Sequence, residues 1–96
     1  MLQKLQRYRE KKDMSKLQKT IVNRVKGLCE ERNLSTYALA NRAGIPGTTM
    51  FHFMDGSTKN TRISTIVQIC DGLEMTLAEF FSTPEFEELL KSVGEE

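Results

Sequence analysis

The sequence predicts an all-α fold of five short helices, with a basic extension before them and an acidic helical extension after them. Apolar residues recur at spacings of three and four along the chain, which is the period of helices that bury one face. Residues that favour helix starts and stops separate these stretches. The alternation of apolar and polar residues that marks a half-buried strand does not occur in the sequence, so we expect no sheet.

The first helix is predicted over residues 16–32. Its apolar residues form one stripe at helical spacing: Leu17, Ile21, Val25, Leu28 and Cys29. Asn33 and Leu34 end this helix. In the basic segment before it, residues 1–13 either extend the helix or form an arm. That segment lacks the apolar stretch of a secretory signal peptide, so we expect a cytoplasmic protein.

Two short helices are predicted next. Ser35 is a favoured N-cap, and the helix that it starts runs to Ala43 and stops at Gly44. The following helix begins near Pro46, because a proline in the first turn lacks only an N–H group that has no partner there. It ends at residues 55–56. The apolar positions of the helix that Ser35 starts are Tyr37, Leu39, Ala40 and Ala43.

Three helical segments are predicted in the remainder of the chain. After a polar loop, a strongly apolar helix spans residues 62–73, with Gly72 near its stop. Thr76 or a neighbour caps a short helix, and Pro84 starts an acidic helix that runs to Val93. The apolar residues of the first segment are Ile63, Ile66, Val67, Ile69 and Cys70. Those of the last two segments either complete the core or contact a second copy of the chain: Phe80, Phe81, Phe86, Leu89 and Leu90.

The length and composition fit one globular domain. A chain of 96 residues, with 39% hydrophobic and 28% charged residues, is typical of a soluble domain, and no apolar run approaches the roughly 18 residues of a membrane span. We expect a basic extension at residues 1–15, the domain at 16–83 and an acidic helical tail at 84–96.

The sequence carries no motif for a cofactor or for catalysis. Cys29 and Cys70 form no CxxC pair, and the chain has one histidine, so we expect buried thiols and no metal site. Paired carboxylates in a cleft, a phosphate-binding glycine loop and a small-molecule ligand site are not evident. An enzyme is therefore not expected.

Charge is divided along the chain. Residues 1–62 hold 13 of the 14 Lys and Arg residues but only 5 of the 13 acidic residues, which gives a net charge of +8. Residues 63–96 hold one lysine against eight acidic residues, which gives a net charge of −7. Such a division indicates either a nucleic-acid-binding face or a solvated basic segment.

Residues 36–55 have the spacing of two helices that cross at a tight turn. The crossing requires a small residue in the first helix and a permissive backbone in the turn, and Ala40 and Gly44 occupy these positions. Five apolar residues are expected to bury the second helix against the first: Leu39, Ala43, Ile45, Met50 and Phe53. The helical period then turns another face outward, formed by Gly47, Thr48, Phe51, His52 and Asp55.

These residues resemble the helix-turn-helix of the Cro/C1-type regulators, also called the XRE family, to which the lambda repressor belongs. The resemblance covers residues 21–81, including the closing pattern from Gly72 to Phe81. It implies a lambda repressor-like five-helix DNA-binding domain in a sequence-specific transcriptional regulator, most simply a repressor. It also implies a homodimer on double-stranded DNA, with the helix at 46–55 of each subunit in a major groove and half-sites about 34 Å apart.

The resemblance also assigns site residues. Four would face the bases: Gly47, Thr48, Phe51 and His52. Six would contact phosphates: Ser35, Thr36, Thr49, Lys59, Asn60 and Arg62. Gly47 departs from the family pattern, because relatives often carry a long amide side chain there, and it offers only a close backbone approach. Thr48 and His52 would hydrogen-bond to bases, and Phe51 would pack on a thymine methyl group.

Some of these assignments have alternatives. Ser35 caps a helix whether or not it contacts a phosphate, and Phe51 either contacts DNA or packs on a loop or a partner. The motif also fits a protein-interaction module, such as an antitoxin-like regulator, because residues 46–55 contain no Lys or Arg. DNA binding through phosphates weakens steeply with salt, whereas binding of a protein helix is less sensitive.

Overall fold

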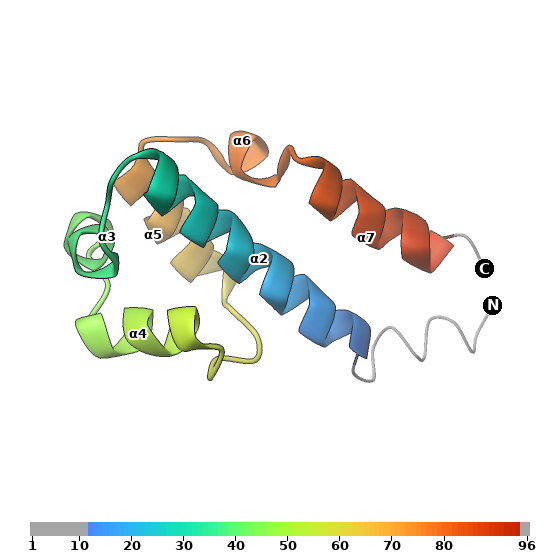
Figure 1. Cartoon of the computed structure of the whole chain (residues 1–96), viewed down its shortest axis with the longest axis horizontal. Coiled ribbons are helices and arrows are strands. Elements are labelled where there is room, and N and C mark those ends of the chain that lie inside the picture. The colour runs from blue at the N-terminus through green and yellow to red at the C-terminus, as the bar shows by residue number, and fades with distance from the viewer. Residues whose placement is uncertain (1–11, 95–96) are drawn as a thin grey trace.

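The computed structural model describes residues 12–94 of the chain and the side chains of residues 16–89. The all-α prediction is confirmed for these residues, and none of the described helices is long and apolar enough to cross a membrane. Figure 1 shows α2 as a long central helix, with α3, α4 and α5 around its C-terminal half and α7 beside its N-terminal half. The described helices are α2 (Lys12–Glu31), α3 (Thr36–Ala43), α4 (Gly47–Asp55), α5 (Ile63–Leu73), α6 (Leu77–Phe81) and α7 (Pro84–Gly94).

α2 begins at Lys12, so the last residues of the predicted basic extension belong to this helix, and residues 1–11 lie outside the described part. Its predicted stripe faces the core, with Val25 fully buried. The helix ends next to the predicted stop, where Asn33 takes the left-handed conformation with φ +55°. Asparagine tolerates this conformation better than most residues that carry a side chain. The N–H of Leu34 then donates to the carbonyl oxygen of Cys29 at 2.9 Å.

Capping groups define the ends of α3 and α4. The Ser35 hydroxyl accepts a hydrogen bond from the Ala38 N–H at 3.0 Å, and Gly44 stops α3 with φ +70°. Pro46 is the N-cap of α4, and Gly56 ends α4 with φ +91°. Glycine is favoured at both stops because a Cβ strains a left-handed backbone. The predicted bounds of α3 are confirmed, and α4 begins one residue later than predicted.

The core lies between α2, α3, α4 and α5, and α3 packs most extensively on α5. Gly72 lies where these two helices touch, because a Cβ at this position would be 3.0 Å from the backbone nitrogen of Ala43. Gly72 is near the end of α5 as predicted, but the left-handed residue that stops the helix is Glu74, with φ +57°. The five residues predicted to bury α4 against α3 are all buried: Leu39, Ala43, Ile45, Met50 and Phe53.

Three residues predicted on apolar faces are exposed instead. Tyr37 on α3 is 74% exposed, and Ile63 and Val67 on α5 are 62% and 45% exposed. Each lies at the edge of its helix's apolar stripe, away from the fully buried Leu39 or Ile69. Helical spacing groups such residues with the core, but packing covers only the centre of a stripe.

The C-terminal helices contribute to the same core. Phe86 and Leu89 of α7 are 8% and 6% exposed, and α7 packs along α2. The Phe86 ring lies 4.8 Å from the ring centre of Phe81, which lies 5.0 Å from that of Phe80. The structure therefore supports the core alternative for Phe80, Phe86 and Leu89, while the side chain of Leu90 lies outside the described residues.

Candidate nucleic-acid interface

α4 exposes to solvent the side that carries the four predicted base-facing residues, which we call the reading face. Met50 and Phe53 are each 1% exposed and anchor the helix on the core. Phe51 is 61% exposed, so no described part of its own chain covers this ring. The four predicted base-facing residues are all exposed: Gly47, Thr48, Phe51 and His52.

The first turn of α4 is open at the backbone. The first hydrogen bond into this helix runs from the Met50 N–H to the Pro46 carbonyl oxygen at 3.0 Å, so the N–H groups before Met50 have no partner within the helix. Gly47 has no positive φ, and a Cβ there would meet nothing within 4 Å, so packing does not require glycine. The missing side chain leaves room for a close partner at these N–H groups.

His52 and Asp55 form a small polar cluster at the end of α4. Asp55 Oδ1 accepts a hydrogen bond from the Ser57 N–H at 2.8 Å, and Asp55 Oδ2 lies 4.0 Å from His52 Nδ1. Hydrogen bonds from the Ser57 hydroxyl and backbone N–H lower the pKa of the Asp55 carboxyl, and the nearby His52 adds to this effect. Asp55 is therefore ionised at neutral pH and keeps one imidazole nitrogen beside a carboxylate.

The predicted phosphate-binding residues lie at the starts of α3 and α4 and in the loop that leads to α5. They are exposed, at the start of α3, in the first turn of α4 and before α5: Ser35, Thr36, Thr49, Lys59, Asn60 and Arg62. None of these three helices has an acidic residue in its first turn, whereas α6 has Glu79 and α7 has Glu85 and Glu87. Because a helix N-terminus carries partial positive charge, α3, α4 and α5 favour an anion there.

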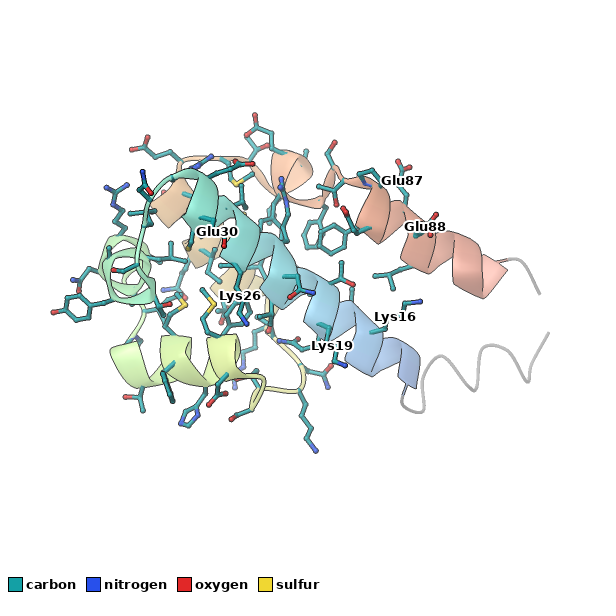
Figure 2. The ribbon with its side chains drawn as sticks, in the orientation of Figure 1. Lys16, Lys19, Lys26, Glu30, Glu87 and Glu88 are labelled. Carbon is teal, nitrogen blue, oxygen red and sulfur yellow. The ribbon has the colours of Figure 1, made fainter. Side chains whose placement is uncertain are left out.

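Charge is divided in space as well as along the sequence. Figure 2 shows Lys16, Lys19 and Lys26 along α2, while Glu87 and Glu88 project from α7 on the side away from α4. All five side chains are exposed. Glu87 and Glu88 therefore lie on a different helix from the reading face of α4.

Gln18, next to the candidate interface, has a role that the spacing of apolar residues did not predict. Gln18 on α2 is only 8% exposed and forms two hydrogen bonds with Thr61, just before α5. A signal was present, because the residues three, four and seven positions later are all apolar: Ile21, Val22 and Val25. A polar residue on such a face is expected to have a buried partner, but spacing cannot identify it.

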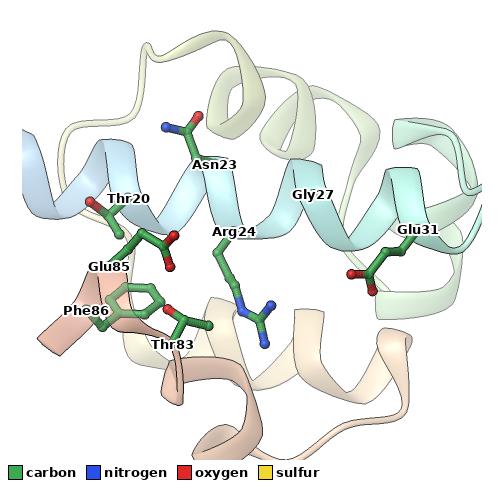
Figure 3. A pocket seen from close by; sticks show the side chains of 8 residues that line it. All are labelled: Thr20, Asn23, Arg24, Gly27, Glu31, Thr83, Glu85 and Phe86. Carbon is green, nitrogen blue, oxygen red and sulfur yellow. The ribbon is translucent and has the colours of Figure 1, made fainter.

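A groove of about 380 Å³ lies between α2 and α7 (Figure 3). Arg24 lies in this groove, and its Nε and Nη2 donate to the carbonyl oxygens of Phe80 and Glu79 at 2.8 and 2.9 Å. Its guanidinium also lies 5.8 Å from the centre of the Phe80 ring. These contacts satisfy carbonyl groups at the end of α6, so Arg24 has a structural role there.

The two thiols are core groups. Cys29 and Cys70 are buried, and this burial raises the pKa of both thiols above the ordinary value. They are protonated at neutral pH and pack as small apolar side chains. Within the residues that the structure describes, no group of three His, Cys, Asp or Glu side chains could hold a metal ion.

Comparison with protein families gives one match that covers both the core and the candidate interface. The family model of the Cro/C1-type HTH DNA-binding domain matches residues 24–85, which are 62 of the 96 residues. The match runs from the second half of α2 to the start of α7 and contains every predicted base-facing and phosphate-binding residue. No curated protein and no solved structure matches the chain significantly.

Proposed function

The chain belongs to the Cro/C1-type helix-turn-helix DNA-binding family, and from this premise we propose that it is a transcriptional repressor that binds operator DNA as a homodimer. In this proposal α2 to α6 form the lambda repressor-like five-helix domain. α4 of each subunit enters a major groove of a two-fold operator, and the half-sites lie about 34 Å apart. Occupancy of the operator by the dimer blocks the promoter.

The observation that carries this proposal is the exposed face of α4. Two buried residues, Met50 and Phe53, fix the helix on the core, while its other face is uncovered. A helix held in this way keeps its exposed side chains in fixed positions, as the recognition of base edges requires. The starts of α3, α4 and α5, free of acidic side chains, supply the anion-binding groups beside it.

Each residue on the face has a distinct role in the proposal. Thr48 and His52 hydrogen-bond to base edges, and Phe51 packs against a thymine methyl group. Gly47 allows the backbone N–H groups at the start of α4 to approach the DNA closely. Because two of these four positions make no side-chain hydrogen bond, apolar and shape contacts contribute much of the sequence preference.

The proposal is tested by selection from a pool of random-sequence duplexes. We expect the retained sequences to share a two-fold motif with half-sites one helical turn apart. His52→Ala should relax the preference at one base pair in each half-site, at a cost of about 1–3 kcal/mol in affinity. Lys59→Ala should weaken binding to all sequences alike and serves as the control, since phosphates carry no sequence information. A retained pool with no enriched motif would refute sequence-specific binding.

A second function, binding of a protein partner, has one observation in its favour. Phe51 is 61% exposed on a helix whose residues 46–55 contain no Lys or Arg, and such a surface also suits a partner's apolar helix. An antitoxin-like regulator would use it in this way. This alternative requires that the wild-type chain bind no duplex at low salt, where phosphate contacts are strongest.

A further inference from the structure

We propose that Gln18 is a positioning residue for DNA binding, because its carboxamide holds the α4–α5 loop (residues 57–62) in the conformation that presents Lys59 and Arg62 to phosphates. The inference rests on the proposed function. Gln18 lies on α2, outside the matched residues 24–85, and 43 residues before its partner in the loop.

The contact between Gln18 and Thr61 is a matched pair of hydrogen bonds. Gln18 Nε2 donates to Thr61 Oγ1 at 2.7 Å, and the Thr61 N–H donates to Gln18 Oε1 at 3.0 Å. The first distance is at the short end of the usual range for N–H···O hydrogen bonds, and the second is typical. A carboxamide offers a donor and an acceptor side by side, so it satisfies both groups of Thr61 at once. The side chain of Gln18 is 8% exposed, so little water competes for these bonds.

The α4–α5 loop is held at two points along its length. At its start, the N–H groups of Ser57 and Thr58 donate to the carbonyl oxygen of His52 at 3.1 and 3.2 Å, which ties the loop to α4. Near its end, Thr61 is tied to Gln18 on α2. Lys59 lies between these two anchors, and Arg62 directly follows the second. Both side chains are exposed.

The position of the Gln18–Thr61 contact beside Arg62 links this contact to DNA binding. Arg62 is the N-cap of α5, so the position of Thr61 also sets the direction in which α5 begins. A loop that is already fixed loses less conformational freedom when its cations contact phosphates. Loss of the contact should therefore weaken binding to every sequence by the same factor, since only phosphate contacts are affected.

The test compares Gln18→Met, Thr61→Val and the double variant with wild type. Methionine keeps the length of glutamine without its hydrogen-bonding groups, and valine removes only the Thr61 hydroxyl. The matched control is Gln68→Met, because Gln68 Nε2 donates to the Ala43 carbonyl oxygen at 3.5 Å, away from the loop. Thermal melts of all variants identify a temperature at which each is folded, and binding and hydrogen exchange are measured at that temperature.

Gln18→Met should speed hydrogen exchange of the Thr61 amide and weaken binding to selected and random duplexes alike, by about fivefold. It should also make the affinity less dependent on salt. Thr61→Val should weaken binding in the same way, and the double variant should be no weaker than Gln18→Met, because the two residues act as a unit. Gln68→Met should bind as wild type.

A lower melting temperature for Gln18→Met with unchanged affinity and salt dependence would overturn the positioning role and leave a structural one. In that case the wild-type chain still binds DNA, so the proposed function stands. Absence of DNA binding by the wild-type chain would instead overturn the proposed function, and the positioning role with it.

Discussion

At the scale of single residues, Gly72 sets how closely α5 approaches α3. A Cβ at Gly72 would lie 3.0, 3.1 and 3.2 Å from the backbone nitrogen, Cα and Cβ of Ala43. Two of these atoms belong to the backbone of α3 at the buried residue Ala43, which cannot move aside as a flexible side chain would. Gly27 on α2 is the opposite case, because it is exposed and a Cβ there would meet nothing within 4 Å.

Gly72→Ala should lower the free energy of unfolding by about 1–3 kcal/mol, because the helices must separate to accept the methyl group. Gly27→Ala is the matched control and should raise it by about 0.5–1 kcal/mol, since alanine favours a helix and nothing is displaced. Urea denaturation of both variants measures the two values. Equal effects in the two variants would show that α3 and α5 are not in close contact at Gly72.

Residue roles were predictable where they depend on neighbours in the sequence. Ser35 as a cap and Gly44 as a stop follow from local backbone chemistry, and both are confirmed. The partner of Gln18 is 43 residues away, and the exposure of Tyr37 depends on which helices pack on α3. Such facts arise from the tertiary arrangement, which a periodic pattern does not specify.

At the scale of elements, side-chain hydrogen bonds cap the starts of α3 and α6, and of these two only the start of α6 carries an acidic residue. The Thr76 hydroxyl accepts a hydrogen bond from the Glu79 N–H at 3.0 Å, and the Glu79 carboxylate accepts one from the Thr76 N–H at 2.8 Å. This capping box starts α6 and places a carboxylate at the helix start. Ser35 caps α3 with its hydroxyl alone, and the start of α3 has no acidic residue.

Ser35→Ala and Thr76→Ala should each lower the free energy of unfolding by about 1 kcal/mol, because each removes an N-cap hydrogen bond. Only Ser35→Ala should also weaken DNA binding, since only the start of α3 is proposed to contact a phosphate. Thr76→Ala is therefore the control for a loss of stability alone. The measurements are denaturation midpoints and duplex affinity. Equal duplex affinities of the two variants would show that Ser35 caps α3 and does not contact a phosphate.

The bounds of most elements were predictable because capping residues mark them, and the bounds of α3 were predicted without error. The start of α2 was left open between a longer helix and an arm, and the described helix includes residues 12–15, which agrees with the longer helix for these residues. For the candidate site, the period of α4 predicted which face is exposed once Met50 and Phe53 were assigned to the core. The hydrogen bonds that hold the α4–α5 loop could not be predicted in this way, because they join distant segments.

At the scale of the whole molecule, α7 extends the core beyond the five predicted helices. Phe86 packs with Phe80 and Phe81, and Arg24 links α2 to the end of α6. Phe86 therefore attaches the acidic helix α7 to the core by apolar contacts, while Glu87 and Glu88 remain exposed on this helix (Figure 2).

Phe86→Ala should lower the free energy of unfolding by about 3 kcal/mol, because the ring is buried within the monomer. The matched control is Phe51→Ala, whose ring is 61% exposed and whose removal should change stability by about 0.5 kcal/mol or less. Sedimentation of Phe86→Ala under folding conditions should match that of wild type. A loss of dimer with unchanged monomer stability would instead identify Phe86 as an interface residue.

The central claim, DNA binding with phosphate contacts from the helix starts and the α4–α5 loop, is tested most directly by duplex affinity as a function of salt. Between about 50 and 200 mM salt, the logarithm of the binding constant should fall linearly with the logarithm of salt concentration, with a slope of about −0.9 per phosphate contacted. Lys59→Ala and Arg62→Ala should each reduce the magnitude of the slope by about 1. No binding at the lowest salt, or an affinity that does not change with salt, would contradict the claim.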